Sequence, residues 1–302
     1  MIKSVTATNY LGESLTFELG KPDETGIYVQ SIDGLGPVAA TINTTELSSS
    51  DGSVFNSARL NQRNIVMNFG LMFNPIIEDM RHRLYKFFPL KKPVRIDVLT
   101  DRRKCYTIGY VETNNPNIFS KEETQQVSII CPTPWLYGIV DGMGEIDLYY
   151  ISKTFEFPFP LLGDTIEFGE IQNYTSVSFN YEGDDETGML FTLHFQGTVT
   201  ADFTIADAKT NERLTIKSNA DSAGGFHFGD TLYISTIKGQ KYVRLQPNSS
   251  TELQNKIVLL DRDSDWLSLR NGENEIGIFS ETEGVTDLIK ASIDYNILYM
   301  GV

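Results

Sequence analysis

The acidic run from Asp261 to Asp265, DRDSD, is the sharpest candidate for metal binding in the sequence. Alternating carboxylates of this kind begin the calcium-binding loop of an EF-hand, where they supply oxygen ligands to the ion. That loop also needs glycine at its sixth position and glutamate at its twelfth, where this chain has Trp266 and Gly272. We therefore interpret the run as an acidic turn between strands and predict no metal site.

Histidine and cysteine, which often carry catalysis, are few in this chain. The three histidines, His82, His194 and His227, are interpreted as unpaired with acidic or cysteine neighbours at ligand spacing. Cys105 and Cys131 lack CxxC spacing and are predicted to be buried, small apolar residues. No GxSxG, HExxH, P-loop or GxGxxG motif is present. The sequence therefore predicts no catalytic or cofactor-binding residues, no cofactor and no enzymatic activity.

Charge is distributed unevenly along the chain, whose net charge is −15. Residues 1–137 contain 14 basic and 14 acidic side chains, whereas residues 138–302 contain 11 and 26. An acidic half is repelled by nucleic acid and by anionic membranes, so neither is predicted as a partner. The basic residues between Arg81 and Lys104 lie in the neutral half, and we interpret them as a subunit interface or a solvated face.

The length of 302 residues predicts two domains. The first 20 residues contain no apolar core of the length that a signal peptide needs, and no run approaches the roughly 18 apolar residues of a membrane span. These features predict a protein that is made in the cytoplasm and does not insert into a membrane.

The first half predicts an α+β domain with one helix. The helix is expected over residues 74–88, with Asn74 as its cap, Pro75 at its first position and an apolar stripe that covers a sheet. A long loop is expected over TTELSSSDG, residues 44–52. Alternating apolar residues predict a first hairpin, then a strand pair joined by residues 61–63, and finally a three-stranded meander; these strands are 4–10, 14–19, 54–60, 64–73, 94–99, 105–112 and 124–131.

The second half shows no long amphipathic helix, and its short strands recur every 8 to 15 residues with turn signals between them, as in a β-sandwich. The expected strands are 176–181, 189–196, 201–206, 212–217, 231–235, 241–245, 256–260, 266–270, 275–279 and 291–299.

The stretch SIICPTPWLYG, residues 128–138, is predicted to be the boundary between the domains. Its two prolines prevent an inner strand from continuing, and the excess of acidic residues begins just after it. We predict domains at 1–137 and 138–302 and expect cleavage near Gly138 to yield two separately folded pieces.

Several segments resemble the distal tail proteins (Dit) of long-tailed, siphovirus-type bacteriophages and of related phage-derived tail particles. In the first half the order of segments also matches, with NQRNIVMN before the helix and KKPVR after it. The segments that carry the resemblance are 61–68, 91–95, 103–114, 117–121, 126–137, 266–274 and 293–302.

This resemblance implies a mainly β protein, in which a tail-tube-like α+β domain precedes a galectin-like β-sandwich. It implies a structural hub at the tail tip or baseplate of the virion, assembled in the bacterial cytoplasm. The first domain would form a ring, typically a homohexamer, at the end of the tail tube. The implied partners are the tube protein, the tail-associated lysin or tip protein, and receptor-binding or baseplate proteins.

An alternative function is binding of host cell-wall polysaccharide by the second domain. Glycan sites need an exposed aromatic platform flanked by polar groups. Alternating aromatic residues near the start of the second half are candidates for it, although such residues more often pack in a strand or linker; they are Tyr149, Tyr150, Phe155, Phe157 and Phe159.

Overall fold

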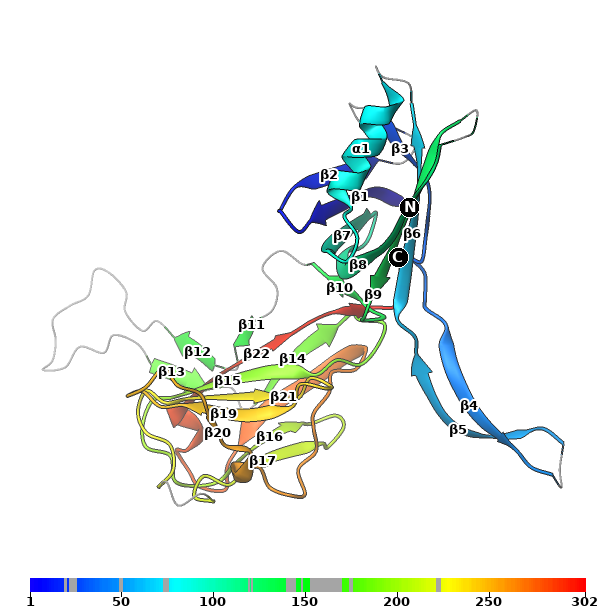
Figure 1. The fold of residues 1–302 in the computed structure, drawn as a ribbon. Coiled ribbons are helices and arrows are strands. Elements are labelled where there is room, and N and C mark those ends of the chain that lie inside the picture. The colour runs from blue at the N-terminus through cyan, green and yellow to red at the C-terminus, as the bar shows by residue number, and fades with distance from the viewer. Residues whose placement is uncertain are drawn as a thin grey trace, which may run out of the picture. The chain divides into compact units, whose positions relative to one another are not determined.

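A computed structural model of the chain divides into two compact units (Figure 1). The first consists of residues 1–141 together with 298–302, and the second of residues 142–297. That the chain forms two domains that fold independently, 1–137 and 138–302, stays a prediction. The structure describes residues 1–18, 21, 26–48, 51–72, 76–118, 120, 122–139, 145–147, 149–152, 170–173, 176–220 and 224–302, with backbone alone for 145–147, 149–152 and 170–173.

The first unit is built on an antiparallel sheet with the strand order β2-β1-β7-β8-β9-β6-β3. The predicted first hairpin and the meander are confirmed by the register of β1 with β2 and of β7, β8 and β9. The strands are β1 (Ile2–Asn9), β2 (Ser14–Glu18), β3 (Ile27–Asp33), β6 (Arg63–Leu71), β7 (Pro93–Thr100), β8 (Lys104–Asn117) and β9 (Thr124–Cys131), with β10 (Leu136–Gly138) and β23 (Leu298–Tyr299) joined at one side.

The core of this unit lies between the sheet and α1 (Ile77–Phe87), the one α-helix among its described residues. The ring centroids of Phe17, from β2, and Phe69, from β6, are 5.2 Å apart, so strands distant in the sheet order meet around the core. Leu84 of the helix is fully buried, which confirms that the apolar stripe covers the sheet. Asn114 of β8 donates hydrogen bonds to the carbonyls of Leu84 and Phe88 and so satisfies the end of the helix.

The helix begins later than predicted. Its N-cap is Ile76, which has an extended backbone and makes no side-chain capping bond, and the predicted cap Asn74 lies outside the described residues. Because an extended residue cannot belong to a helical turn, the first helical residue is Ile77.

Two expectations about strand pairing in the first half are wrong. Strand β5 (Ser53–Leu60) pairs with β4 (Ala40–Glu46), which includes part of the predicted loop, and not with β6. Strand β6 pairs instead with β9 and with β3, which the sequence pattern did not reveal. The residues between β5 and β6 therefore do not form a hairpin turn but return the chain from a separate two-stranded arm to the sheet.

The second unit contains a six-stranded sheet, β11-β22-β15-β18-β19-β20, and a four-stranded sheet, β14-β21-β16-β17. Rings from both sheets meet in its core: Phe195 of β15 and Phe203 of β16 lie 6.2 Å apart. The strands are β11 (Glu145–Asp147), β14 (Ser176–Tyr181), β15 (Met189–Phe195), β16 (Phe203–Asp207), β17 (Arg213–Ile216), β18 (Thr231–Ser235), β19 (Tyr242–Gln246), β20 (Gln254–Asn255), β21 (Gly272–Phe279) and β22 (Ile289–Tyr295), with β12 (Tyr149–Ser152) and β13 (Glu170–Asn173) paired separately.

Three predicted strands of the second half are corrected. Residues Ile257–Leu259 form a 3-10 helix, η1, and residues 266–270 contribute only an isolated bridge from Leu269 to Thr187. The last predicted strand divides into β22 and the short β23, which belongs to the first unit. An alternating pattern of apolar residues shows only that one side of a segment is buried. A turn or loop that packs on a sheet also has one buried side, so the pattern does not distinguish it from a strand.

The predicted fold class, mainly β with one α-helix and an α+β first half, is confirmed. Within the described ranges, no helix has the length and apolar character that crossing a membrane requires.

Candidate functional site

The β4–β5 hairpin is an arm that projects from the sheet of the first unit (Figure 1). Every residue of its two strands is exposed to solvent except Thr41, which is half-buried. A two-stranded hairpin is at best marginally stable in water without a surface to pack on. The arm therefore has the properties of a segment that is completed by another surface.

One face of this arm is apolar. The register places Ala40 opposite Leu60 and Ile42 opposite Ala58 on the same face, and a bulge after Asn43 brings Phe55 opposite Thr44 on that face. Ile42 and Phe55 are 61% and 62% exposed. We call these five residues, Ala40, Ile42, Phe55, Ala58 and Leu60, the apolar arm face.

The other face of the arm is polar and internally hydrogen-bonded. Asn43 donates to Ser57 Oγ at 3.0 Å, and Asn56 donates to Thr45 Oγ1 at 2.7 Å. At the base of the arm, Thr41 donates to Asn61 Oδ1 at 2.7 Å. These polar side chains make hydrogen bonds within the chain, so the polar face does not need another molecule to satisfy them. The apolar residues of the other face remain exposed to solvent.

Arg63 fixes the base of the arm. It is fully buried, and burial lowers the pKa of its guanidinium. Its Nε and Nη2 donate to the Pro134 carbonyl at 3.0 and 2.7 Å, and Nη2 also donates to Met300 O at 2.8 Å. Its Nη1 donates to Gly34 O and, at 2.7 Å, to Gly36 O. One side chain thus joins the loop that enters the arm, the predicted boundary segment and residue 300.

Residues 298–302 are held in the first unit by several further contacts. Strand β23 pairs with β10, and Arg103 donates to Gly301 O at 2.9 Å while its guanidinium lies 4.2 Å from the centre of the Tyr299 ring. The Val302 N–H donates to Leu35 O at 3.1 Å, in the loop that enters the arm. The segment therefore forms part of the base that orients the arm.

A second uncovered apolar surface lies on the outer face of the sheet. Tyr110 of β8 is 49% exposed and stands opposite Pro93 of β7 and Ile130 of β9. Ile108, two residues earlier on the same face, is 46% exposed. We call these four residues, Pro93, Ile108, Tyr110 and Ile130, the outer strip. It crosses three strands, whereas Leu11 and Ile118, which are also exposed, lie beyond strand ends.

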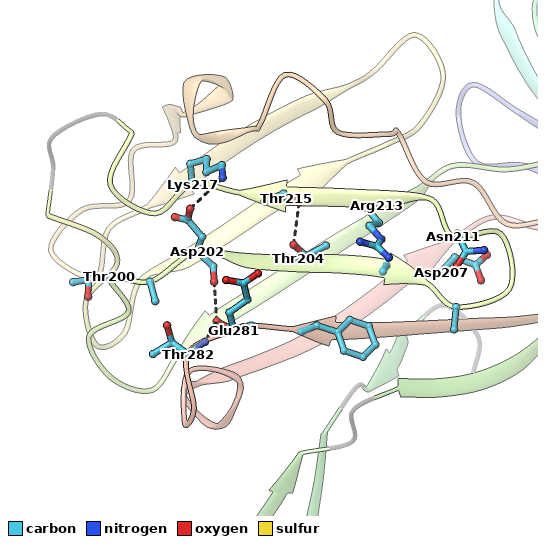
Figure 2. Close-up of a pocket in the computed structure, with 15 residues that line it drawn as sticks. Thr200, Asp202, Thr204, Asp207, Asn211, Arg213, Thr215, Lys217, Glu281 and Thr282 are labelled. Carbon is cyan, nitrogen blue, oxygen red and sulfur yellow. Dashed lines mark hydrogen bonds and ion pairs between the residues drawn. The ribbon is translucent and has the colours of Figure 1, made fainter.

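The second unit carries an open groove of about 860 Å³ over strands β16, β17 and β21 (Figure 2). Phe279, Thr204 and Thr215 form one row across its floor, and the two threonine hydroxyls lie 2.9 Å apart. At one end Lys217 Nζ lies 3.4 Å from carboxylate oxygens of both Asp202 and Asp261, and these hydrogen-bonded carboxylates raise the pKa of Lys217. The groove offers hydroxyls, an ion pair and a partly exposed ring.

The candidates from the sequence are not brought together into a site. In the predicted acidic turn, Asp261 faces Lys217, and Asp265 accepts a bond from the backbone N–H of Arg213 at 3.3 Å. No group of three or more His, Cys, Asp and Glu side chains with metal-binding geometry occurs among the described residues. The proposed platform of Tyr149, Tyr150, Phe155, Phe157 and Phe159 lies outside the residues whose side chains are described.

Both cysteines are buried, as predicted, and are poor nucleophiles. Burial raises the pKa of Cys131 and raises that of Cys105 to about 11, so the reactive thiolate is scarce at neutral pH. The stretch that contains Cys131 therefore has a structural role in the core.

The interpretation that all three histidines are unpaired is wrong for two of them. His82 Nε2 lies 3.8 Å from Glu78 one helical turn earlier, and His227 Nδ1 lies 3.7 Å from Asp230. Both imidazoles are largely exposed, and such surface pairs contribute little. His194 Nδ1 lies 2.9 Å from Thr231 Oγ1 on the neighbouring strand.

Sequence reasoning missed the arm and the role of Arg63. The alternation in AATI and SARL could have revealed an amphipathic hairpin, although its apolar face is short. Nothing in the local sequence could have revealed Arg63, because its acceptors are backbone carbonyls up to 237 positions away.

Comparison with family models finds a match for part of the first unit. Residues 20–131 match the family model of the phage tail protein RIFT-related domain. Residues 20–131 are therefore similar to a domain that occurs in phage tail proteins. A comparison with curated protein sequences finds no match.

A solved structure shows a similar fold over nearly the whole chain. The Dit protein (gp 19.1) of phage SPP1, described as a paradigm of the hub adsorption apparatus in phages that infect Gram-positive bacteria, matches with a TM-score of 0.60 and 14% identity over 97% of this chain and 98% of that chain. The chain has the distal tail protein fold, and the resemblance found in the sequence is confirmed.

Two structures of the phage P2 baseplate in its activated conformation are more distant. The structure with Ca matches with a TM-score of 0.43 and 12% identity over 98% of both chains. The structure with Sr matches with a TM-score of 0.41 and 11% identity over 97% of both chains.

Proposed function

We propose that this protein is a structural, non-catalytic hub of the phage tail tip, in which several copies, six by the resemblance, form a ring through their first units. The tail tube and the tip or lysin protein would bind the two sides of this ring, and receptor-binding or baseplate proteins would bind its periphery. The ring would be a component of the virion, assembled in the host cytoplasm. The observation that carries this proposal is the apolar arm face, which no part of the described chain covers.

The distribution of charge supports this arrangement. The near-neutral first half can pack closely against copies of itself, whereas the acidic second halves repel one another and are expected at the periphery. An arm that binds a different surface of the next copy makes a head-to-tail contact, and repetition of such a contact closes into a ring when the rotation is suitable.

Replacing Phe55 by aspartate is expected to weaken association about 30-fold, corresponding to about 2 kcal/mol for each interface, because a charge would be buried where an aromatic anchor had packed. The measurement is multi-angle light scattering over a dilution series, with ring symmetry checked by electron microscopy. Val54→Asp is the matched control, since Val54 is exposed on the opposite face of the arm. Wild-type protein that stays monomeric at high concentration and in tail particles would exclude the ring.

A second candidate function, binding of a neutral cell-wall glycan, is favoured by the groove of the second unit. A sugar ring could stack on Phe279, which is 38% exposed, while its hydroxyls bond to Thr204, Thr215 and Lys217. Phe279→Ala in the full chain is expected to reduce retention on a glycan array about tenfold. Phe228→Ala is the control, because Phe228 is an exposed aromatic residue that does not line this groove. Wild-type protein that binds no glycan would remove this candidate.

A further inference from the structure

We propose that the outer strip of one copy is the surface that receives the apolar arm face of the next copy. This inference rests on the proposed ring and assigns both sides of its contact. The two surfaces belong to the same chain, and both are uncovered there: Phe55 and Ile42 on the arm, and Ile108 and Tyr110 on the sheet. Since every copy carries both, each copy can offer its arm to one neighbour and its strip to another.

The shapes of the two surfaces are compatible. Each is one face of an antiparallel sheet, and such faces pack about 10 Å apart with their side chains interdigitated. The arm presents two cross-strand apolar pairs and the large ring of Phe55. The outer strip presents a row across three strands, Pro93, Tyr110 and Ile130, with Ile108 beside it.

The charges also permit close contact. The charged residues in the strands of the arm are Glu46 and Arg59, at opposite ends. Arg59 is on the polar face opposite Thr41, whereas Glu46 is on the same face as Ile42, at the far end of β4. Beside the strip, Arg95 stands opposite Ile108, but its Nη2 lies 2.7 Å from Asp97 Oδ1 and its guanidinium stacks 3.9 Å from the centre of the Tyr106 ring. Arg59 and Arg95 therefore need not be buried without a partner when the surfaces meet. Glu46, beyond Thr44 and opposite Ser53, would lie at the edge of the contact.

A double-mutant cycle on assembly tests the contact. Phe55→Asp and Tyr110→Asp are each expected to weaken association at least tenfold. The association of the double variant is expected to be weakened by much less than the product of the two single fold-changes, because both substitutions remove the same contact. Tyr10→Asp, at an exposed tyrosine outside the strip, is the control and should leave association unchanged. Independent effects of Phe55→Asp and Tyr110→Asp would overturn the assignment.

Cross-linking between copies gives a second readout. Phe55→Cys and Tyr110→Cys proteins, purified separately and mixed, are expected to form a dimer band with a short bis-maleimide that neither forms alone. Val54→Cys replaces Phe55→Cys in the control mixture and should react at least fivefold less, while the buried Cys105 and Cys131 make wild type a suitable blank. Rings without the 55–110 product would refute the strip but keep the proposed function; absence of rings would refute both.

Discussion

Replacing Arg63 by alanine is expected to lower the free energy of unfolding of the first unit by about 4 kcal/mol. The substitution leaves four backbone carbonyls without their charged donor, those of Gly34, Gly36, Pro134 and Met300. Water could form hydrogen bonds with these carbonyls only by entering the space that the Arg63 side chain fills, which is inaccessible to solvent in the native state. The loss is therefore larger than for an ordinary polar side chain.

Urea unfolding followed by tryptophan fluorescence measures this effect. Trp135 lies beside Pro134 in the first unit, and Trp266 lies in the second. Arg59→Ala, at an exposed arginine of the arm, is the matched control and should cost less than about 0.5 kcal/mol. Arg63→Lys should recover little stability, because one ammonium group cannot reach all four carbonyls. A cost below about 1 kcal/mol for Arg63→Ala would contradict the assigned role.

Gly34→Ala is expected to destabilise the first unit by about 3 kcal/mol. Gly34 has φ of +88°, and a Cβ at this position would overlap the carbonyl oxygen of Asn64 at the start of β6. Because that oxygen belongs to strand backbone, the loop itself must move, and the bond from Arg63 to Gly34 O is weakened as a result. Backbone strain and loss of a buried bond therefore add.

Gly12→Ala separates these two contributions. Gly12 has a similar φ of +84°, but a Cβ there would meet no atom within 4 Å. It should cost about 1 kcal/mol, the strain of the left-handed backbone alone. Equal midpoints for the two variants in thermal unfolding would show that the approach to Asn64 has no energetic importance.

Much of the fold could be predicted because the signals are local. The first two strands of the meander alternate buried and outward residues over most of their length, as in β7, where Val94, Ile96 and Val98 are buried. The stripe of α1 repeats with helical spacing for the same reason: one side faces the core. Such patterns need no knowledge of distant residues.

The remaining features depend on partners that local patterns do not specify. The arm is exposed throughout, so part of it could not be distinguished from a polar loop. The pairing of β6 with β3 and β9 depends on long-range register. The sequence around Arg63 shows only a charged residue in a strand, because its role depends on acceptors that are distant in the chain. The residues of the outer strip become neighbours only through the register of β7, β8 and β9.

The position of residues 298–302 has a consequence for biosynthesis. The ribosome completes residues 1–141 before it begins the second unit, yet the first unit also needs Met300 as an acceptor for Arg63. At about 5–20 residues per second, synthesis of the second unit keeps the first unit incomplete for roughly ten to thirty seconds. During that interval the base of the arm lacks one of its anchors, so nascent chains on neighbouring ribosomes present an incompletely fixed arm. In the proposed ring, the base of the arm would be fully anchored only in chains whose synthesis has passed β23.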